Sequence, residues 1–338
     1  MTGLRVGIIG YGYWGPNLTR NFFEIPSSDL IAIADLNEER LKQALLKYPQ
    51  IHAKRDYQEL FELDLDAVVI ATPPATHYSI AKDCLEHNLN VLIEKPLTLK
   101  SEHAETLIKL ADEKDLTLMV GHTFEYNSAV HALKGYIDSG ELGQVYYLDA
   151  ARLNLGLFQR DSNVLWDLAP HDISILLHLL GKPPISVSAQ GSPCVIDGIH
   201  DVVYMNLEFP DNISAHIHVS WLDPCKVRRI TVVGSKKMAI YNDIENDSKI
   251  KIYDKGVDVP AYTNGFGEFQ CNYHSGDITI PNIHFTEPLR QECQHFLDSI
   301  VNHTEPRSSG RAGLEVVKVL EAAQHSLMNG QTKEIIQW

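Results

Sequence analysis

The sequence lacks a long hydrophobic run. Its first ten residues, MTGLRVGIIG, contain an apolar stretch that is too short to span a bilayer and that ends in glycine rather than at a small-residue cleavage site. We therefore expect no membrane partner and a buried strand at this position. The 338 residues exceed the length at which a single core usually stops growing, so we expect two domains.

The sequence also lacks a paired-cysteine motif and an excess of basic charge. Its five cysteines are scattered and include no CxxC pair, which argues against a disulfide framework or a zinc site and favours reduced thiols in a cytoplasmic protein. The net charge of -15 argues against a nucleic-acid partner, because such a surface needs basic residues to neutralise phosphates. Any phosphate-bearing ligand must therefore be bound mainly by backbone groups.

The N-terminal part of the chain alternates between apolar strands and amphipathic helices. In chain order we predict strand 4–9, helix 16–23, strand 30–34, strand 66–71, helix 75–87, strand 90–93, helix 101–114 and strand 117–120. Strands separated by helices are typical of a parallel sheet that is covered on both faces. We predict an α/β Rossmann domain with a doubly wound parallel sheet over residues 1–121.

A glycine-rich turn, Gly10-Tyr11-Gly12-Tyr13-Trp14-Gly15, follows the first predicted strand. In the dinucleotide-binding pattern the three glycines permit the tight turn, the approach of a pyrophosphate and close packing of the next helix, whose N-terminus supplies N–H donors. Asp35 ends the second strand about 20 residues later, where its carboxylate can bind ribose hydroxyls and repel a 2′-phosphate. The pattern predicts NAD rather than NADP.

Three further stretches follow predicted strands, at the edge where such sheets bind ligands. They are Thr72-Pro73-Pro74, Glu94-Lys95-Pro96 and Gly121-His122. Lys95 follows a buried strand, and its ammonium could stabilise alkoxide character that develops on a substrate oxygen. The alternative is an ordinary surface pair of Glu94 and Lys95, which would contribute little to stability.

A second candidate group lies in the stretch Trp166-Asp167-Leu168-Ala169-Pro170-His171-Asp172. Because proline is tolerated in the first turn of a helix, Pro170 predicts a helix that starts near Asp167 and His171, with both on one face. His171 could accept an alcohol proton, and Asp167 could orient it or hold a hydroxyl. A structural Asp–His pair is an equal alternative. We interpret His178, deeper in the apolar segment, as structural.

The hydrophobic period changes to two from residue 144 onward. Strands predicted at 145–154, 202–209, 213–221 and 228–233 follow one another without helices, so we expect an α+β domain over residues 122–338 with a large, mainly antiparallel open sheet. Helices at 287–301 and 313–328 should pack back on the body, and residues 265–281 are predicted as a loop. His216 and His218 share a strand face but lack a third ligand, so we expect no metal site.

These motifs together resemble the Gfo/Idh/MocA oxidoreductases, nearly from end to end. The residues that carry the resemblance are the glycine turn, Ala71-Thr72-Pro73 with His77, Glu94-Lys95-Pro96, and Asp167 with His171. The resemblance implies that Lys95 is catalytic, that His171 is the acid/base and that Asp167 is its orienting or substrate-binding neighbour. It further implies NAD contacts from Tyr13, Trp14, Thr72, Pro73, His77, Glu94 and Lys95, and substrate contacts from Lys95, His122, Asn127, Asn163, Trp166, Asp167 and His171.

The stretch from Asn163 to Asp172 most resembles members of the family that act on nucleotide-linked amino sugars. This implies hydride transfer between a sugar carbinol carbon and nicotinamide C4, with oxidation at C3 of UDP-N-acetylglucosamine or its uronic acid. A dehydrogenase of free aldoses or inositols and a non-catalytic dinucleotide sensor are the alternatives. The resemblance also implies a homodimer or homotetramer that forms through the C-terminal sheet.

Overall fold

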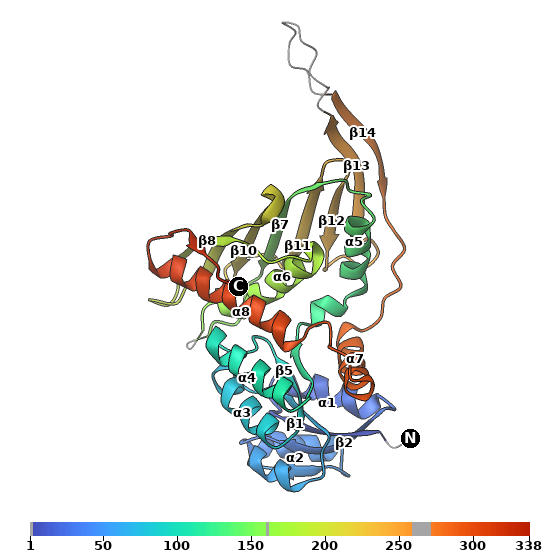
Figure 1. Cartoon of the computed structure of the whole chain (residues 1–338), viewed down its shortest axis with the longest axis vertical. Coiled ribbons are helices and arrows are strands. Elements are labelled where there is room, and N and C mark those ends of the chain that lie inside the picture. The colour runs from blue at the N-terminus through green and yellow to red at the C-terminus, as the bar shows by residue number, and fades with distance from the viewer. Residues whose placement is uncertain (1–2, 160–161, 259–271) are drawn as a thin grey trace, which may run out of the picture. The chain divides into compact units, whose positions relative to one another are not determined.

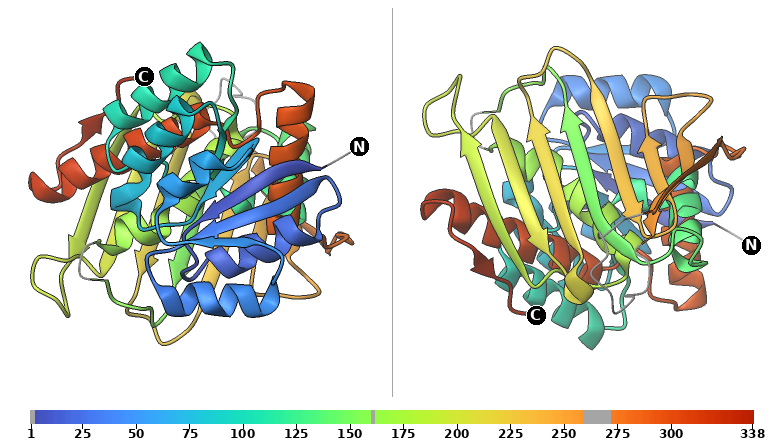
Figure 2. Two further views of the ribbon diagram at one scale, coloured as in Figure 1. Left: turned by 90° about the horizontal axis from the view of Figure 1, so that it is seen from below. Right: turned by 90° about the horizontal axis from the view of Figure 1, so that it is seen from above.

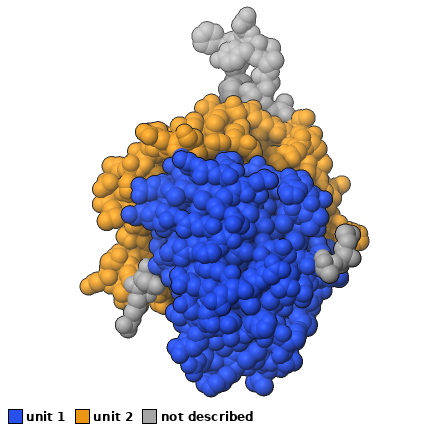
Figure 3. Space-filling model, turned by 60° about the horizontal axis from the view of Figure 1, so that its bottom comes forward, with its two compact units in different colours: residues 1–126, 286–321 blue, residues 127–285, 322–338 orange. Residues whose placement is uncertain are grey.

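The computed structural model describes residues 3–159, 162–258 and 272–338, and the chain divides into two compact units (Figure 3). Unit 1 comprises Met1–Tyr126 and Thr286–Glu321, and unit 2 comprises Asn127–Phe285 and Ala322–Trp338. The predicted functional domains, 1–121 and 122–338, remain a prediction. The compact units themselves divide the chain after Tyr126 and place a C-terminal segment with the first sheet.

Unit 1 is built on a six-stranded sheet whose paired strands all run parallel, in the order β3-β2-β1-β4-β5-β6. Figure 1 labels β1, β2 and β5 of this sheet. The order reverses between β1 and β4, which is the point where doubly wound sheets bind dinucleotides. The strands are β1 (Leu4–Ile9), β2 (Ser28–Ala34), β3 (His52–Lys54), β4 (Ala67–Ile70), β5 (Asn90–Glu94) and β6 (Leu118–Gly121). The predicted doubly wound parallel sheet is confirmed.

The helices of unit 1 come from both ends of the sequence. They are α1 (Gly15–Glu24), α2 (Glu38–Lys47), α3 (Pro74–Glu86), α4 (Ser101–Glu113), α7 (Pro288–Asn302), the first part of α8 (Gly310–Met328) and the short helices η1 (Tyr57–Glu62) and η2 (Thr123–Tyr126). The apolar side of α7 joins the same buried cluster as β1 and α1, with Phe296 packed edge-on against Phe22. This shared core explains why a late segment belongs to unit 1.

Unit 2 contains a nine-stranded sheet in the order β14-β13-β12-β11-β7-β10-β9-β8-β15. Only the pair of β7 and β10 is parallel among its described strand pairs, so the predicted mainly antiparallel sheet is confirmed. The strands are β7 (Val145–Leu153), β8 (Ser186–Ser192), β9 (Val202–Glu208), β10 (Ser214–Ser220), β11 (Val227–Gly234), β12 (Met238–Asn242), β13 (Ile250–Asp258), β14 (Asn272–Thr279) and β15 (Glu334–Ile335).

One face of this sheet forms the core of unit 2. The helix α6 (Val164–Leu180) packs on β7, β9 and β10, and α5 (Ser128–Asp138) lies beside α6. Ala215, Ile217 and Val219 of β10 are buried on this side, as their alternation predicts. The other face is turned toward the viewer in Figure 2, right, and the described residues place no helix over its central strands. Association of copies through this face remains a prediction.

Two local predictions for unit 2 were wrong. The helix α6 starts at Val164, so Pro170 lies inside it rather than in its first turn. Its N-cap is Asn163, and a capped apolar helix of this length tolerates the missing N–H of one proline. The predicted loop 265–281 contains β14, which pairs with β13, while its residues 265–271 lie outside the described ranges.

No helix in the described ranges is both long and apolar enough to cross a membrane.

Candidate active site

The glycine turn between β1 and α1 leaves space for a ligand at one of its three glycines. Gly10 has φ 97°, and a Cβ there would lie 2.6 Å from the Ala71 carbonyl oxygen; a Cβ on Gly15 would lie 2.3 Å from the Gly10 carbonyl oxygen. At Gly12 the nearest atom is Nη1 of Arg40, at 3.7 Å from the Cβ position. Two glycines are therefore required by the fold, and the third keeps open the approach that a pyrophosphate needs.

The N-terminus of α1 fits an anionic ligand. Its N-cap residue, Trp14, makes no side-chain cap hydrogen bond, and the first turn contains no acidic residue. The preceding Tyr13 is 83% exposed and packs edge-on against the Trp14 ring at 6.0 Å. Uncapped N–H groups at a helix N-terminus bind phosphate through hydrogen bonds and the helix dipole.

Asp35, at the end of β2, is held by the backbone beside this turn. Its carboxylate accepts hydrogen bonds from the backbone N–H groups of Tyr11, at 2.6 Å, and Asn37, at 2.8 Å. An ionised carboxylate has further acceptor capacity, so these bonds orient Asp35 without excluding a ribose hydroxyl. Arg40 of α2, which the sequence patterns did not single out, places Nη1 3.6 Å from the same carboxylate. A helix over 38–47 was not predicted, although Asn37 caps it.

His77 of α3 connects the loops that follow β4 and β5. It is fully buried, with Nδ1 2.8 Å from the Pro96 carbonyl oxygen and Nε2 2.9 Å from the Thr72 carbonyl oxygen. Burial lowers the pKa of the ring, and a neutral ring donates to only one of these acceptors at a time. Thr72 also accepts a bond from the Thr76 hydroxyl at 2.8 Å. We infer that His77 supports the predicted cofactor site through these loops; its direct contact with NAD remains a prediction.

Glu94 and His122 surround the base of Lys95, which is half-buried. Glu94 ends β5 and is 9% exposed; burial raises the pKa of its carboxyl to about 7, against the opposing effect of the Lys95 charge. His122 is 1% exposed, and neither ring nitrogen has a hydrogen-bond partner among the described residues. Burial and the Lys95 charge lower the pKa of His122 to about 3. At neutral pH this ring is uncharged.

The N-terminus of α6 holds the second candidate group. The Asn163 side chain caps the helix by accepting from the Trp166 N–H at 3.3 Å. Gln324 Oε1 accepts from both Asn163 Nδ2, at 2.9 Å, and Trp166 Nε1, at 3.2 Å. Sequence reasoning missed Gln324, because its distance along the chain leaves no local signal. These contacts fix both predicted substrate-binding residues within unit 2.

Asp167 and His171 lie four residues apart within α6 and are both half-buried. Trp221 Nε1 donates to Asp167 Oδ2 at 2.9 Å, which fixes the orientation of the carboxylate. The next residue along the helix, Asp172, forms a buried two-bond ion pair with Arg152 of β7, at 2.7 and 3.0 Å. The sequence patterns identified the Asp–His spacing but not these two partners.

The other predicted residues of unit 2 have structural contacts. Asn127 caps α5 by accepting from the Ala129 N–H at 2.9 Å. The His178 ring meets the His131 ring edge-on at 5.5 Å, in keeping with a structural role. On the open sheet face, the rings of His216 and His218 stack on Tyr204. The described residues contain no group of three or more potential metal ligands.

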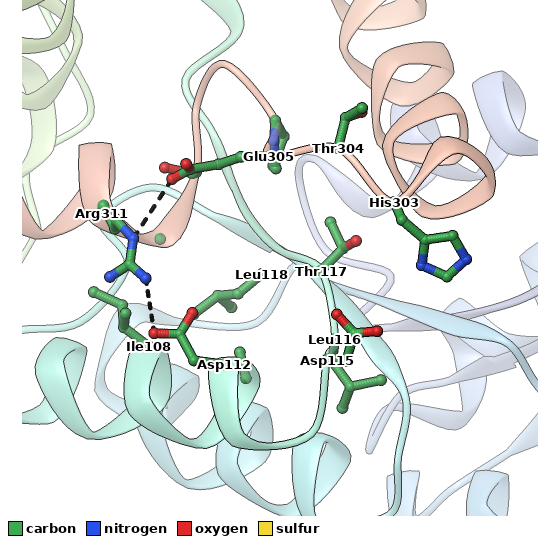
Figure 4. A pocket seen from close by; sticks show the side chains of 14 residues that line it. Ile108, Asp112, Asp115, Leu116, Thr117, Leu118, His303, Thr304, Glu305 and Arg311 are labelled. Atoms are coloured by element: carbon green, nitrogen blue, oxygen red, sulfur yellow. Dashed lines mark hydrogen bonds and ion pairs between the residues drawn. The ribbon is translucent and has the colours of Figure 1, made fainter.

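A cavity of about 200 Å³ in unit 1 lies at the other end of the sheet (Figure 4). It is lined by the last turn of α4, the start of β6 and the segment that joins α7 to α8. Arg311 spans it, with ion pairs to Asp112 at 2.8 Å and to Glu305 at 3.7 Å. Because ligands of doubly wound sheets bind at the carboxyl ends of the strands, we assign this cavity no part in the reaction.

Two family models match this chain. The model of the oxidoreductase family with an NAD-binding Rossmann fold covers residues 4–122, and the model of the GFO/IDH/MocA C-terminal domain covers residues 130–240. The chain belongs to the Gfo/Idh/MocA oxidoreductase family. The resemblance expected from the motifs is thereby confirmed, and NAD is the cofactor of this fold.

Curated relatives of this Gfo/Idh/MocA protein align along nearly its whole length. UDP-N-acetylglucosamine 3-dehydrogenase of Acidithiobacillus ferrooxidans is 27% identical over 94% of this chain and 95% of its own. Myo-inositol 2-dehydrogenase of Thermotoga maritima is 24% identical, with 96% of each chain covered.

Solved structures also align with this Gfo/Idh/MocA protein along nearly its whole length. The A. ferrooxidans enzyme superposes with a TM-score of 0.79 at 26% identity, over 98% of this chain and all of that one. A protein of gentamicin A biosynthesis, solved with NAD, superposes with a TM-score of 0.83 at 23% identity, over 100% of this chain and 97% of its own. The similarity to the second structure supports the fold alone. The protein is an NAD-dependent dehydrogenase of this family.

Proposed function

We propose that the protein oxidises the C3 hydroxyl of a nucleotide-linked amino sugar, UDP-N-acetylglucosamine or its uronic acid, to a ketone. The observation that carries this proposal is the full-length similarity to a UDP-N-acetylglucosamine 3-dehydrogenase. The stretch from Asn163 to Asp172, which forms the start of α6, supports it through its resemblance to members that act on such sugars.

Lys95 polarises the substrate oxygen in this proposal. Its ammonium stabilises negative charge that develops on that oxygen as hydride leaves the carbon. The uncharged His122 ring beside it adds no competing positive charge, because burial keeps its pKa low. NAD, when bound, supplies the hydride acceptor, and the protein supplies alignment and electrostatics.

His171 takes the proton of the hydroxyl, and Asp167 orients it or holds a neighbouring hydroxyl. An imidazole is the side chain best suited to proton transfer near neutral pH. The hydrogen bond from Trp221 to Asp167 supports this assignment, because a carboxylate that must orient a partner needs a fixed position of its own. The helical spacing of Asp167 and His171 places their side chains on one face of α6.

The second candidate substrate is a free inositol or aldose. The full-length similarity to a myo-inositol 2-dehydrogenase favours it, at slightly lower identity. The two candidates differ in the need for a nucleotide. A sugar-nucleotide enzyme should lose most of its turnover when the nucleotide is removed, because remote binding energy contributes to the transition state.

A panel of steady-state assays separates these candidates. NADH formation is measured with UDP-N-acetylglucosamine, its uronic acid, free N-acetylglucosamine and myo-inositol. We expect kcat/KM to be highest for one of the two UDP sugars, with a ketone at C3 identified by mass spectrometry after borodeuteride reduction. Higher kcat/KM with myo-inositol would overturn the proposed substrate, and no activity with any member of the panel would overturn both candidate substrates.

A further inference from the structure

Besides Asp35, the described residues of unit 1 include three carboxyl groups that are almost completely removed from water. Glu94 of β5, Glu125 of η2 and Glu292 of α7 are 9%, 5% and 0% exposed. Repulsion from Glu94 and Glu125, together with burial, raises the pKa of Glu292 well above its usual value. Glu292 therefore lies within electrostatic range of both other carboxyl groups, and we call the three the carboxyl cluster.

The carboxyl cluster has few hydrogen-bond partners. Neither carboxyl oxygen of Glu292 has one within normal bonding geometry among the described residues, and the nearby Thr123 hydroxyl only partly offsets the raised pKa. The guanidinium of Arg307 bonds the Glu125 backbone oxygen at 3.0 Å and lowers the pKa of its side chain, but burial dominates and raises it to about 8. Three ions of one sign cannot coexist in such a site, so the cluster holds protons at neutral pH.

Three other titratable groups around the cluster stay in one protonation state near neutrality. His122 remains uncharged, and burial raises the pKa of the Tyr126 hydroxyl and the Cys293 thiol. Glu315 of α8 faces Glu125 and also has a raised pKa. Positive charge comes from Lys95 toward Glu94 and from Arg307 toward Glu125. Glu94 is therefore the cluster member whose ionisation responds most directly to a charge added near Lys95.

Glu94 stands at the edge of the sheet where the cofactor binds. It ends β5 and pairs with Gly121, the last residue of β6; its Oε2 accepts from the Lys95 N–H at 3.3 Å. The carboxyl ends of these strands form the ligand edge of a doubly wound sheet. The nicotinamide ring carries a positive charge in NAD and none in NADH. A carboxyl in a low-dielectric site near this ring is more acidic beside NAD than beside NADH.

We propose that Glu94 couples a proton to the redox state of the cofactor. Its carboxyl loses a proton to solvent when NAD binds and regains one when hydride transfer converts NAD to NADH. The inference rests on the proposed function, which places the nicotinamide near Lys95. Burial of the Glu94 side chain favours its protonated form until the positive ring arrives. The relative affinity of the enzyme for NAD and NADH then depends on pH.

Isothermal titration calorimetry of the substrate-free enzyme tests this. NAD and NADH are each titrated at pH 7 in buffers of different ionisation enthalpy, which gives the number of protons exchanged. We expect NAD to release up to about half a proton, and NADH almost none. As the pH falls from 8 to 6, the ratio of the Kd for NAD to the Kd for NADH should rise roughly three- to tenfold. Equal proton exchange with both cofactors would overturn the proposal.

Two variants assign the effect to its residue. Glu94→Gln keeps the shape of the side chain and should abolish the difference in proton release, whereas Glu125→Gln, a matched buried carboxyl beside Arg307, should preserve it. Loss of the difference in the Glu125 variant alone would contradict the assignment. If Glu94→Gln does not fold, the pH dependence of the wild-type Kd ratio decides, because a constant ratio excludes the coupling.

The outcome is separable from that of the proposed function. Binding of NAD and NADH is measured without substrate, so the wrong sugar leaves the proton count unchanged. An enzyme that oxidises UDP-N-acetylglucosamine but exchanges no extra proton with NAD refutes only the coupling.

Discussion

The two candidate groups of residues differ in how their buried polar atoms are satisfied. In unit 2, Asn163, Asp167 and Asp172 each have well-formed hydrogen bonds to side chains of that unit. In unit 1, the His122 ring and the Glu292 carboxyl have no such partners among the described residues. Groups with well-formed hydrogen bonds hold a fixed geometry, whereas a buried carboxyl without such partners favours its protonated form and releases the proton more readily when a positive charge arrives. The first arrangement suits positioning of a substrate, and the second suits a response to a cofactor.

Replacement of Lys95 should have the largest effect. Lys95→Ala should lower kcat roughly 100- to 1000-fold, because the developing charge on the substrate oxygen loses its stabilising ammonium. The Kd for NAD should change little, and the exposed Lys100 on the same loop offers a matched control in Lys100→Ala. Stopped-flow and steady-state NADH absorbance measure both variants. Unchanged turnover of Lys95→Ala would remove the proposed mechanism.

Breaking the buried ion pair of Arg152 and Asp172 in unit 2 should have the second-largest effect. Arg152→Met leaves Asp172 buried without its guanidinium, which should cost about 3–5 kcal/mol of unfolding free energy. Urea unfolding followed by circular dichroism measures this loss. The double variant Arg152→Met/Asp172→Leu should recover most of it, because no unpaired charge remains. If the single variant were as stable as the wild type, the contrast between the two units would fail.

Replacing the Glu292 carboxyl of unit 1 should raise the free energy of unfolding rather than lower it. The raised pKa of Glu292 means that the folded state holds a proton which the unfolded chain releases above its ordinary pKa of 4.5. That contribution to stability is present below pH 4.5 and is lost as pH rises. Glu292→Met should therefore stabilise the protein by about 1–3 kcal/mol at pH 8, and less at pH 5. Thermal unfolding across this range measures the effect; destabilisation at pH 8 would show that Glu292 has a favourable partner.

The smallest expected effect concerns Arg40. Its guanidinium lies beside Asp35 but is about half exposed, so Arg40→Ala should weaken NAD binding by less than about threefold. A 2′-phosphate would need this cation, so NADP binding should weaken more. Fluorescence titration with NAD and with NADP gives the two Kd values and their ratio. Lys42, which forms an exposed ion pair with Glu39 on the same helix, provides the control Lys42→Ala. Tighter binding of NADP than NAD by the wild type would contradict the prediction drawn from Asp35.

Local patterns predicted what is local in the fold. The glycine turn, the strand runs and the acidic end of β2 depend on neighbours within about 20 residues, and the six-stranded sheet follows from them. The Gln324 and Trp221 contacts join residues far apart in the chain, so no spacing rule could find them. Pro170 misled the prediction of the α6 start, because the local preference of proline is weaker than a capped apolar face.

The return of the chain to unit 1 limits how this protein could be divided or recombined. Residues 286–321 supply Phe296, Leu297 and Cys293 to the core around Phe22, so a fragment cut after Tyr126 would expose an apolar surface that α7 normally covers. Unit 1 is therefore no transplantable N-terminal module. Design can exchange unit 2 only as residues 127–285 together with residues 322–338, with the three junctions after Tyr126, Phe285 and Glu321 preserved.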